Sequence, residues 1–176
     1  MIDRLRIFQR DFIQTGILPE SACDWLHRNG FFSALTSTND RGNYAGGLFD
    51  HSRFVMEELE AMTEYLRLKW LRPQSPSIVG MFHDLCKIDR HKPDPASSSP
   101  DSFKYNDPIL KGHGEKSIML LSQLITLTEE EVYCIRFHMG ALSGNDVPFY
   151  IRAIEKYPNV LYTHTADMAA LHIRML

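Results

Sequence analysis

Hydrophobic residues recur along this chain at spacings of three and four, which is the period of an amphipathic helix. The clearest run is Val55, Leu59, Met62 and Leu66, and it predicts a long helix over about residues 48–71. No stretch alternates apolar and polar residues in the way that half-buried strands do. The pattern therefore predicts an all-α protein.

Capping and helix-ending residues mark the other predicted helices. Ser75 and Pro76 supply an N-cap and a first-turn proline, and Thr128 with Glu131 forms a capping-box pattern. Residues 29–30, Asn-Gly, are a common helix-ending pair. Besides the long helix, the predicted helices cover about residues 2–14, 20–27, 75–87, 117–125, 128–139 and 159–175.

Two stretches have the composition of loops. Residues 36–47 are rich in Ser, Thr, Asn, Asp and Gly, and residues 89–112 contain four prolines and a run of three serines. A connection as long as 89–112 without regular structure is usually a functional lid or a disordered segment. Its basic residues are balanced by aspartates, so charge does not decide between these two interpretations.

The bulk composition fits a globular protein with one sizeable core, because 44% of the 176 residues are hydrophobic. The formal net charge is −3 and there is no long basic run, which disfavours long nucleic acid as a partner. Three separated cysteines without a CxxC pair favour a reducing compartment. No stretch approaches the roughly 20 apolar residues of a membrane helix. We therefore expect a cytoplasmic protein without membrane contact, and the sequence does not predict its oligomeric state.

Five segments each carry an imidazole or a carboxylate, and helical spacing directs several of these groups inward. His51 shares a stripe with Val55, and Asp167 lies between His164 and Leu171 on another. Buried His and Asp are costly unless they are paired or bind a metal, so the five segments together suggest a common metal centre. Imidazole and carboxylate ligands without converging cysteines favour Fe, Mn, Zn, Ni or Co. The segments are residues 47–51, 82–87, 112–117, 136–140 and 164–167.

The adjacent pair His83 and Asp84 is the most specific of these features. Consecutive residues of a helix point about 100° apart, so both can reach metal only from a cleft that wraps around that turn. A carboxylate has two oxygens and can bridge two metals, which a single imidazole cannot do. The nearby Cys86 is interpreted as a small buried residue that fills space.

The ordered set His, His-Asp, His, His, Asp resembles the HD-domain superfamily of metal-dependent phosphohydrolases over about residues 43–170. Its GGLxxH, HDLxK, GHGEKS and HMG elements are similar to a bacterial and phage-associated branch, and to the HD domains of certain bacterial 3′-to-5′ exoribonucleases. The resemblance implies a single HD domain over residues 1–176, a helical bundle around a buried metal cleft. Residues 1–40 would form N-terminal helices and residues 43–170 the metal-binding core.

The resemblance also implies a ligand set for two divalent transition metals per chain. Asp84 would bridge the two metals, as in the two-metal members of the superfamily. If one metal sufficed, the two extra histidines would be plain cleft residues. The four residues that match the ligands of the first metal are His51, His83, Asp84 and Asp167. The two that match the extra histidines of two-metal members are His113 and His138.

The expected reaction is hydrolysis of a phosphomonoester or phosphodiester, most naturally of a nucleotide, by a metal-activated hydroxide. Lys87 matches a lysine that contacts the substrate phosphate in relatives, and Lys116 or Arg136 would help to hold it. His164 is either a substrate or ligand-supporting residue or a satisfied core histidine.

Two other functions fit the same ligand set. One is a non-catalytic domain that binds or senses a nucleotide, and the other is a di-iron oxygenase of the HD type. The cations that flank the predicted ligands favour the hydrolase over a closed structural site. The signature of the cyclic-dinucleotide phosphodiesterases (HD-GYP) is missing, so their substrate is not expected here.

Overall fold

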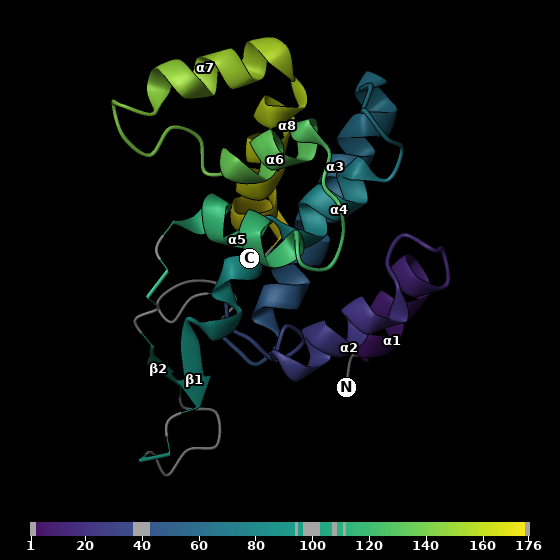
Figure 1. The fold of residues 1–176 in the computed structure, drawn as a ribbon, viewed down its shortest axis with the longest axis vertical. Coiled ribbons are helices and arrows are strands. Elements are labelled where there is room, and N and C mark those ends of the chain that lie inside the picture. The colour runs from purple at the N-terminus through teal and green to yellow at the C-terminus, as the bar shows by residue number, and fades with distance from the viewer. Residues whose placement is uncertain are drawn as a thin grey trace.

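The computed structural model describes residues 3–36, 43–93, 95–96, 103–106, 109–110 and 112–174. Helices dominate this part of the chain (Figure 1), which confirms the predicted all-α class. None of the helices described there is long and apolar enough to cross a membrane. In chain order the elements are α1 (Arg4–Phe8), η1 (Gln9–Ile13), α2 (Glu20–Arg28), α3 (Gly47–Leu66), α4 (Ser75–Phe82), η2 (Leu85–Asp89), β1 (His91–Pro93), β2 (Phe103–Tyr105), α5 (His113–Leu121), α6 (Glu129–Arg136), α7 (Val147–Lys156), α8 (Asn159–Ala169) and η3 (Ala170–Arg174). The η1 and η3 turns are π-helical, and η2 is a 3₁₀ helix.

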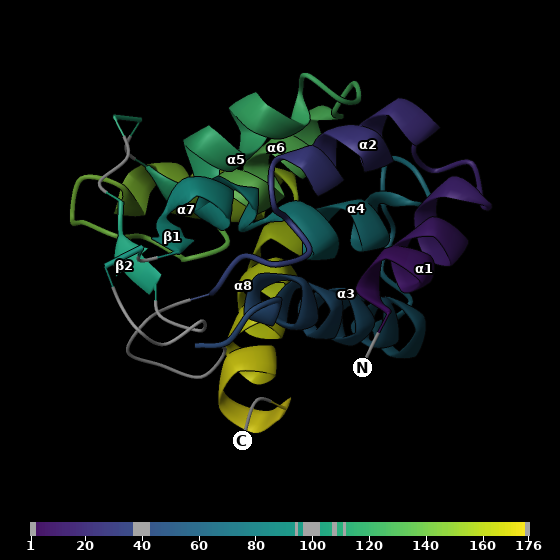
Figure 2. The same cartoon turned by 90° about the horizontal axis from the view of Figure 1, so that it is seen from below.

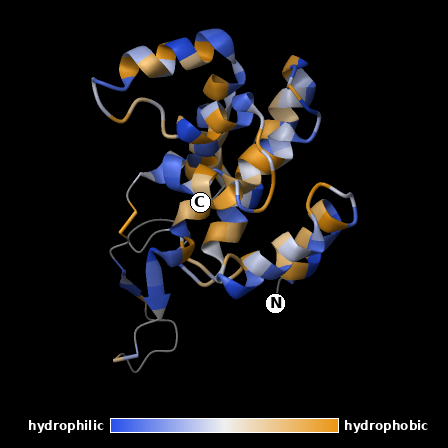
Figure 3. Ribbon diagram, viewed as in Figure 1, coloured by the Kyte–Doolittle hydropathy of each residue, from blue (hydrophilic) through white to orange (hydrophobic). Residues whose placement is uncertain are grey.

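The hydrophobic core extends from the N-terminal helices through α3, α4 and α8, which pack against one another. Figures 1 and 2 show α3 and α4 side by side, with α8 passing close to both. Apolar residues concentrate on the inner parts of these helices, whereas the β1–β2 hairpin at the edge of the molecule is largely hydrophilic (Figure 3). The three central helices therefore form the frame on which the site is built.

Helices α3 and α4 approach each other closely because Gly80 lies against the backbone of α3. A Cβ atom at this position would lie 2.4 Å from the Cα atom of Met56. The carbonyl of Gly80 also accepts a hydrogen bond from Nδ1 of His83, at 2.8 Å. Gly80 therefore fixes the spacing of the two helices through its contact with Met56, and the orientation of the predicted ligand His83 through its carbonyl.

A cluster of phenylalanines joins the N-terminal helices to this frame. The ring of Phe82 lies 5.7 Å from that of Phe12 and 5.9 Å from that of Phe31, and Phe31 lies 6.0 Å from Phe49. Such aromatic contacts add to the stabilisation from burial. Phe49 and Phe82 precede the first two predicted ligand histidines by two residues and by one, so the cluster anchors both ligand-bearing segments.

Helix α6 is held by a buried acid. The predicted capping box is confirmed, with the hydroxyl of Thr128 accepting from the backbone N–H of Glu131. The Glu131 carboxylate accepts two 2.7 Å bonds from Arg72 and one of 2.8 Å from Ser75. A buried charge that is fully hydrogen-bonded specifies one arrangement of its surroundings. It ties α6 to the start of α4.

Four predicted helix ends are wrong. Two of them belong to the helices predicted over 117–125 and 128–139, which already end at Leu121 and Arg136. The helix predicted over 48–71 ends at Leu66, because Arg67 adopts a left-handed conformation (φ 55°) and Leu68 caps the last turn through a bond to Thr63. The helix predicted over 75–87 ends at Phe82, after which the chain turns into η2. The predicted helices 20–27 and 159–175 correspond to α2 and to α8 with η3, and the predicted helix 117–125 begins earlier, with α5.

The sequence pattern also missed two elements. Helix α7 was not predicted, although Pro148 in its first turn is a helix-start signal. Residues 89–112 were expected to lack regular structure, yet they hold the antiparallel hairpin of β1 and β2, with His91 opposite Tyr105. Strands of three residues are too short to show an alternating pattern. The serine run 97–99, Pro100 and Pro108 lie outside the described residues, as do residues 37–42 of the other predicted loop, and the lid interpretation stays a prediction.

We predict that Gly80→Ala lowers the free energy of unfolding by about 1–3 kcal/mol, because the new methyl group overpacks against backbone that no side-chain rotation can relieve. Gly144→Ala is the matched control, since a Cβ atom there meets nothing within 4 Å, and it should change stability by less than about 0.5 kcal/mol. Chemical denaturation of the three proteins measures both effects. Equal stability of the two variants would contradict the close α3–α4 contact.

Candidate metal centre

The structure brings the six predicted metal ligands to one place. Each of them has a nitrogen or oxygen within 3.9 Å of such an atom of another ligand. Five of the six side chains are buried, and that of His113 is 28% exposed. They come from α3 (His51), the turn between α4 and η2 (His83 and Asp84), the first residue of α5 (His113), the turn after α6 (His138) and α8 (Asp167).

The end of α4 at Phe82 explains how the two adjacent ligands reach one centre. Asp84 leaves the helical conformation, with φ −107° and ψ 19°. The turn allows the side chains of His83 and Asp84 to approach to 3.5 Å between Nε2 and Oδ2, which a continuous helix would make difficult because of the 100° step. The sequence predicted that both residues could reach metal only from a cleft that wraps around this turn. The end of the helix at Phe82 makes that arrangement possible.

Four side chains form a first ligand group. Nε2 of His51 lies 3.1 Å from Oδ1 of Asp167 and 3.3 Å from Nε2 of His83. The remaining measured separations in this group are 3.5 Å between His83 and Asp84, 3.7 Å between His83 and Asp167, and 3.8 Å between His51 and Asp84. Ligands held about 2.1 Å from one ion in a tetrahedron lie roughly 3.4 Å apart. The group therefore has the dimensions of a metal site.

Asp84 directs its two carboxylate oxygens to different partners. Oδ2 faces His51 and His83, whereas Oδ1 lies 3.5 Å from Nε2 of His138 and 3.9 Å from Nδ1 of His113. Potential ligands thus lie on both sides of one carboxylate. This arrangement is compatible with a bridging role for Asp84.

Hydrogen bonds to the backbone orient two of the imidazoles. Nδ1 of His83 pairs with the carbonyl of Gly80, and Nδ1 of His138 pairs with that of Ile135, each at 2.8 Å. When Nδ1 carries the donated proton, Nε2 presents its lone pair to the cluster, which is the tautomer that a metal requires. Nδ1 of His164 pairs with the carbonyl of His138 at 2.7 Å, so His164 supports the ligand-bearing turn.

Besides Nδ1 of His51, two buried polar atoms at the centre lack hydrogen-bond partners within the described residues. They are Oδ1 of Asp84 and Nε2 of His138. A buried polar atom without a partner costs about 1–3 kcal/mol, and folded proteins rarely leave such atoms without a compensating group. A cation between them would satisfy both, so the residues present fit a bound metal ion.

The charge state of the cluster also suits a cation. Burial lowers the pKa of His51 and so favours its neutral form. Burial opposes ionisation of Asp84, but Lys87 and His83 overcome it and hold the pKa of this carboxyl well below its usual range. A hydrogen bond from His51 likewise lowers the pKa of Asp167. Burial opposes a charge on His83, but Asp84 overcomes it and raises the pKa of this imidazole, so His83 would have to release its proton when a cation binds, as metal ligands do.

The three predicted phosphate-binding cations lie in different surroundings. Nζ of Lys87 is 2.6 Å from Oδ2 of Asp84, directly at the cluster. Lys116 is buried and bound to both oxygens of Asp89, at 2.6 and 2.8 Å. The remaining cation, Arg136, pairs with Glu115 at 2.6 Å and more weakly with Asp146, and it lines a separate hollow against α7.

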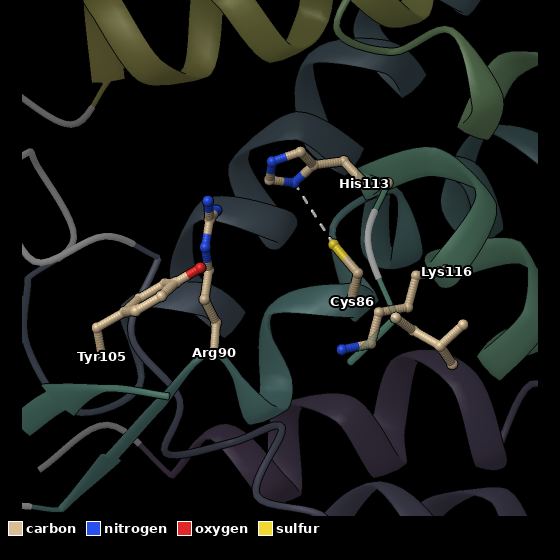
Figure 4. Close-up of a pocket in the computed structure, with 7 residues that line it drawn as sticks. Cys86, Arg90, Tyr105, His113 and Lys116 are labelled. Atoms are coloured by element: carbon tan, nitrogen blue, oxygen red, sulfur yellow. Dashed lines mark hydrogen bonds between the residues drawn. The ribbon is translucent and has the colours of Figure 1, made fainter. Parts of the chain in front are cut away.

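A pocket of about 120 Å³ opens beside the cluster. Figure 4 shows Arg90 and Tyr105 on one side of it and Lys116 on the other, with His113 facing Cys86 between them. Sequence reasoning missed Arg90 and Tyr105 because the hairpin that carries Tyr105 was not predicted. The pocket is lined by Cys86, Arg90, Tyr105, Leu110, Gly112, His113 and Lys116.

Comparison of the chain with protein-family models, with curated proteins and with solved structures finds no match. The buried His and Asp residues nevertheless form groups that could hold a metal ion. The identity of that ion is not fixed by the ligand types, which suit several first-row transition metals.

We predict that Zn²⁺ or Mn²⁺ raises the melting temperature of the metal-free protein. A ligand at 100 times its Kd adds about 2.7 kcal/mol to the stability of the folded state. His83→Ala should clearly reduce this shift, because it removes a ligand of the first group, whereas His27→Ala, an exposed residue of α2, should keep it. Differential scanning calorimetry with and without metal measures the shift. An identical shift in wild type and His83→Ala would place metal binding elsewhere.

Proposed function

We propose that this chain is a metal-dependent phosphohydrolase of the HD superfamily that hydrolyses a phosphomonoester or phosphodiester, with nucleotides as the expected substrate class. The observation that carries the proposal is the buried Asp84, whose two oxygens face separate ligand groups while Lys87 lies against one of them. Two metals that share a carboxylate, next to a cation, are typical of enzymes that transfer phosphoryl groups. The ordered ligand set of the sequence supports the same class.

A pair of divalent metals in this cluster would supply an activated water and polarise the phosphoryl oxygen. The protein contributes an ordered set of donors, since Asp84 and Asp167 are ionised and two imidazoles are held in a single tautomer. Lys87 places a positive charge where negative charge develops on the phosphoryl group. Its side chain is largely buried, which strengthens that interaction relative to one in water.

The adjoining pocket favours a small anionic group with an aromatic neighbour. Its volume of about 120 Å³ is well below the roughly 300 Å³ at which pockets for whole drug-sized ligands begin, so it suits one phosphoryl group. The guanidinium of Arg90 forms no ion pair with a carboxylate in the described part of the chain, and it points toward this space (Figure 4). Tyr105 is 55% exposed at the rim, where a nucleobase could stack on its ring.

Lys116 and Arg136 have smaller roles in this proposal. Lys116 lines the pocket, but its charge is shared with Asp89. The partners of Arg136 are carboxylates outside the metal cluster, and we assign it no direct contact with substrate. Lys87, which is paired with a metal ligand and so lies at the reacting centre, and Arg90 are the cations expected to bind phosphate.

We predict that protein purified without chelator contains about two transition metals per chain and hydrolyses bis-p-nitrophenyl or mono-p-nitrophenyl phosphate. Asp84→Ala should lose both the metals and the activity, because the variant removes the shared ligand. Asp24→Ala, an exposed carboxylate on α2, is the control that should retain both. Metal analysis and release of p-nitrophenol measure the two properties.

The same experiment separates the alternatives. Bound metal without hydrolysis of either ester would contradict the phosphohydrolase and favour a nucleotide sensor. An O₂-reactive di-iron signal from anaerobically purified protein would instead indicate an oxygenase. Fewer than two metals with activity intact would contradict the bridging role of Asp84.

We also predict that Arg90→Ala raises the KM for a nucleoside diphosphate or a 5′-phosphorylated dinucleotide, which carry a second phosphate for the pocket, at least about tenfold, since a charge-assisted hydrogen bond contributes about 1.5–3 kcal/mol. The KM for p-nitrophenyl phosphate should change less, because its single phosphate binds at the metals. Lys92→Ala, an exposed cation on β1 of the same hairpin, is the matched control. Equal effects of the two variants on every substrate would exclude a specific role for Arg90.

A further inference from the structure

Cys86 lies at the metal centre, although the sequence suggested only a space-filling role. It is the second residue of η2, two positions after Asp84. Figure 4 shows its sulfur directed at the imidazole of His113, and Sγ lies 3.6 Å from Nδ1. Both side chains border the pocket, so this sulfur is not merely part of the hydrophobic core.

The donors around His113 form a group of three. One carboxylate oxygen of Asp84, Sγ of Cys86 and one nitrogen of His113 all lie within 4.8 Å of one another. Oδ1 of Asp84, 3.9 Å from His113, is also a buried oxygen without a hydrogen-bond partner in the described residues. An unsatisfied, buried carboxylate oxygen directed at this space is a second, independent indication of a cation.

The sulfur–nitrogen separation has the value that a shared metal imposes. Typical bond lengths of about 2.3 Å to sulfur and 2.0–2.1 Å to nitrogen, at a tetrahedral angle, place the two donors roughly 3.6 Å apart. The observed separation is 3.6 Å. No rearrangement of Cys86 and His113 relative to each other is needed for both to bind one ion.

We propose that Cys86 is a thiolate ligand of the second metal, which it holds together with Asp84 and His113. The inference rests on the metal centre of the proposed function, but not on the reaction. On binding, the metal takes the place of the thiol proton, which is released to solvent. The ion supplies the positive charge that stabilises the thiolate.

A thiolate changes which metals the second site prefers. Sulfur is a soft donor that favours Zn²⁺, Fe²⁺ or Co²⁺, whereas Mg²⁺ and Mn²⁺ favour oxygen. The first group contains only imidazole and carboxylate donors. The two sites would therefore differ in selectivity, and the second would retain Zn²⁺ in competition with excess Mn²⁺.

Cobalt spectroscopy of the full chain tests the proposal. Metal-free protein is titrated anaerobically with Co²⁺ while absorption and bound cobalt are measured. We expect two cobalt ions per chain and a thiolate-to-cobalt charge-transfer band in the near ultraviolet that grows with one of them. Cys86→Ser should lose the band and bind that cobalt at least about tenfold more weakly. Cys23→Ser, an equally buried cysteine of α2, is the matched control and should keep the band.

The outcomes distinguish this inference from the proposed function. Two bound cobalt ions without a charge-transfer band, or a band that persists in Cys86→Ser, would overturn the thiolate ligand and leave the hydrolase intact. Absence of cobalt binding would overturn both. If Cys86→Ser does not fold, a double variant, Cys23→Ser with Cys134→Ser, replaces it, because this variant retains only Cys86. The charge-transfer band should remain in the double variant, and its loss would overturn the thiolate ligand.

Discussion

A buried carboxylate is stable only when cations, hydrogen-bond donors or a metal meet its charge, and in this protein that constraint falls on Asp84. Its Oδ2 is met by Lys87 at 2.6 Å, whereas its Oδ1 has no hydrogen-bond partner in the described residues. Lys87 thus meets part of the charge on Oδ2, which also faces His51 and His83, and Oδ1 is left entirely for an ion. The surrounding imidazoles are arranged about these two oxygens, and the proposed chemistry follows from that division.

The fold holds this carboxylate in place through contacts that lie outside the site. The close approach at Gly80 sets the distance between α3 and α4 and supplies the carbonyl that orients His83. Phe49 and Phe82 fasten the same two segments into the aromatic cluster. On the other side, the buried Glu131 ties α6 to the start of α4 and so positions the turn that carries His138. The precision of the site therefore depends on packing and on one satisfied buried acid.

Much of the fold could be predicted from the sequence because it depends on spacing along single helices, whereas the full ligand set followed from the resemblance of its ordered residues to the HD superfamily. The inward positions of His51 and Asp167 follow from the helical period. The helix end at Phe82 carries no sequence signal, since it depends on how His83 and Asp84 meet residues distant in the chain. The surroundings of Lys116 and Arg136 could not be predicted for the same reason, since their partners come from other segments. The orientation of Cys86 toward His113 is likewise a tertiary property.

The central claim is that Asp84 bridges two metal ions, and anomalous diffraction tests it most directly. Crystals grown with Zn²⁺ and measured on both sides of the zinc absorption edge locate each ion independently of any assumed chemistry. We expect two zinc peaks on opposite sides of the Asp84 carboxylate, about 3.5–4 Å apart. A single peak, or two peaks that do not share Asp84, would contradict it.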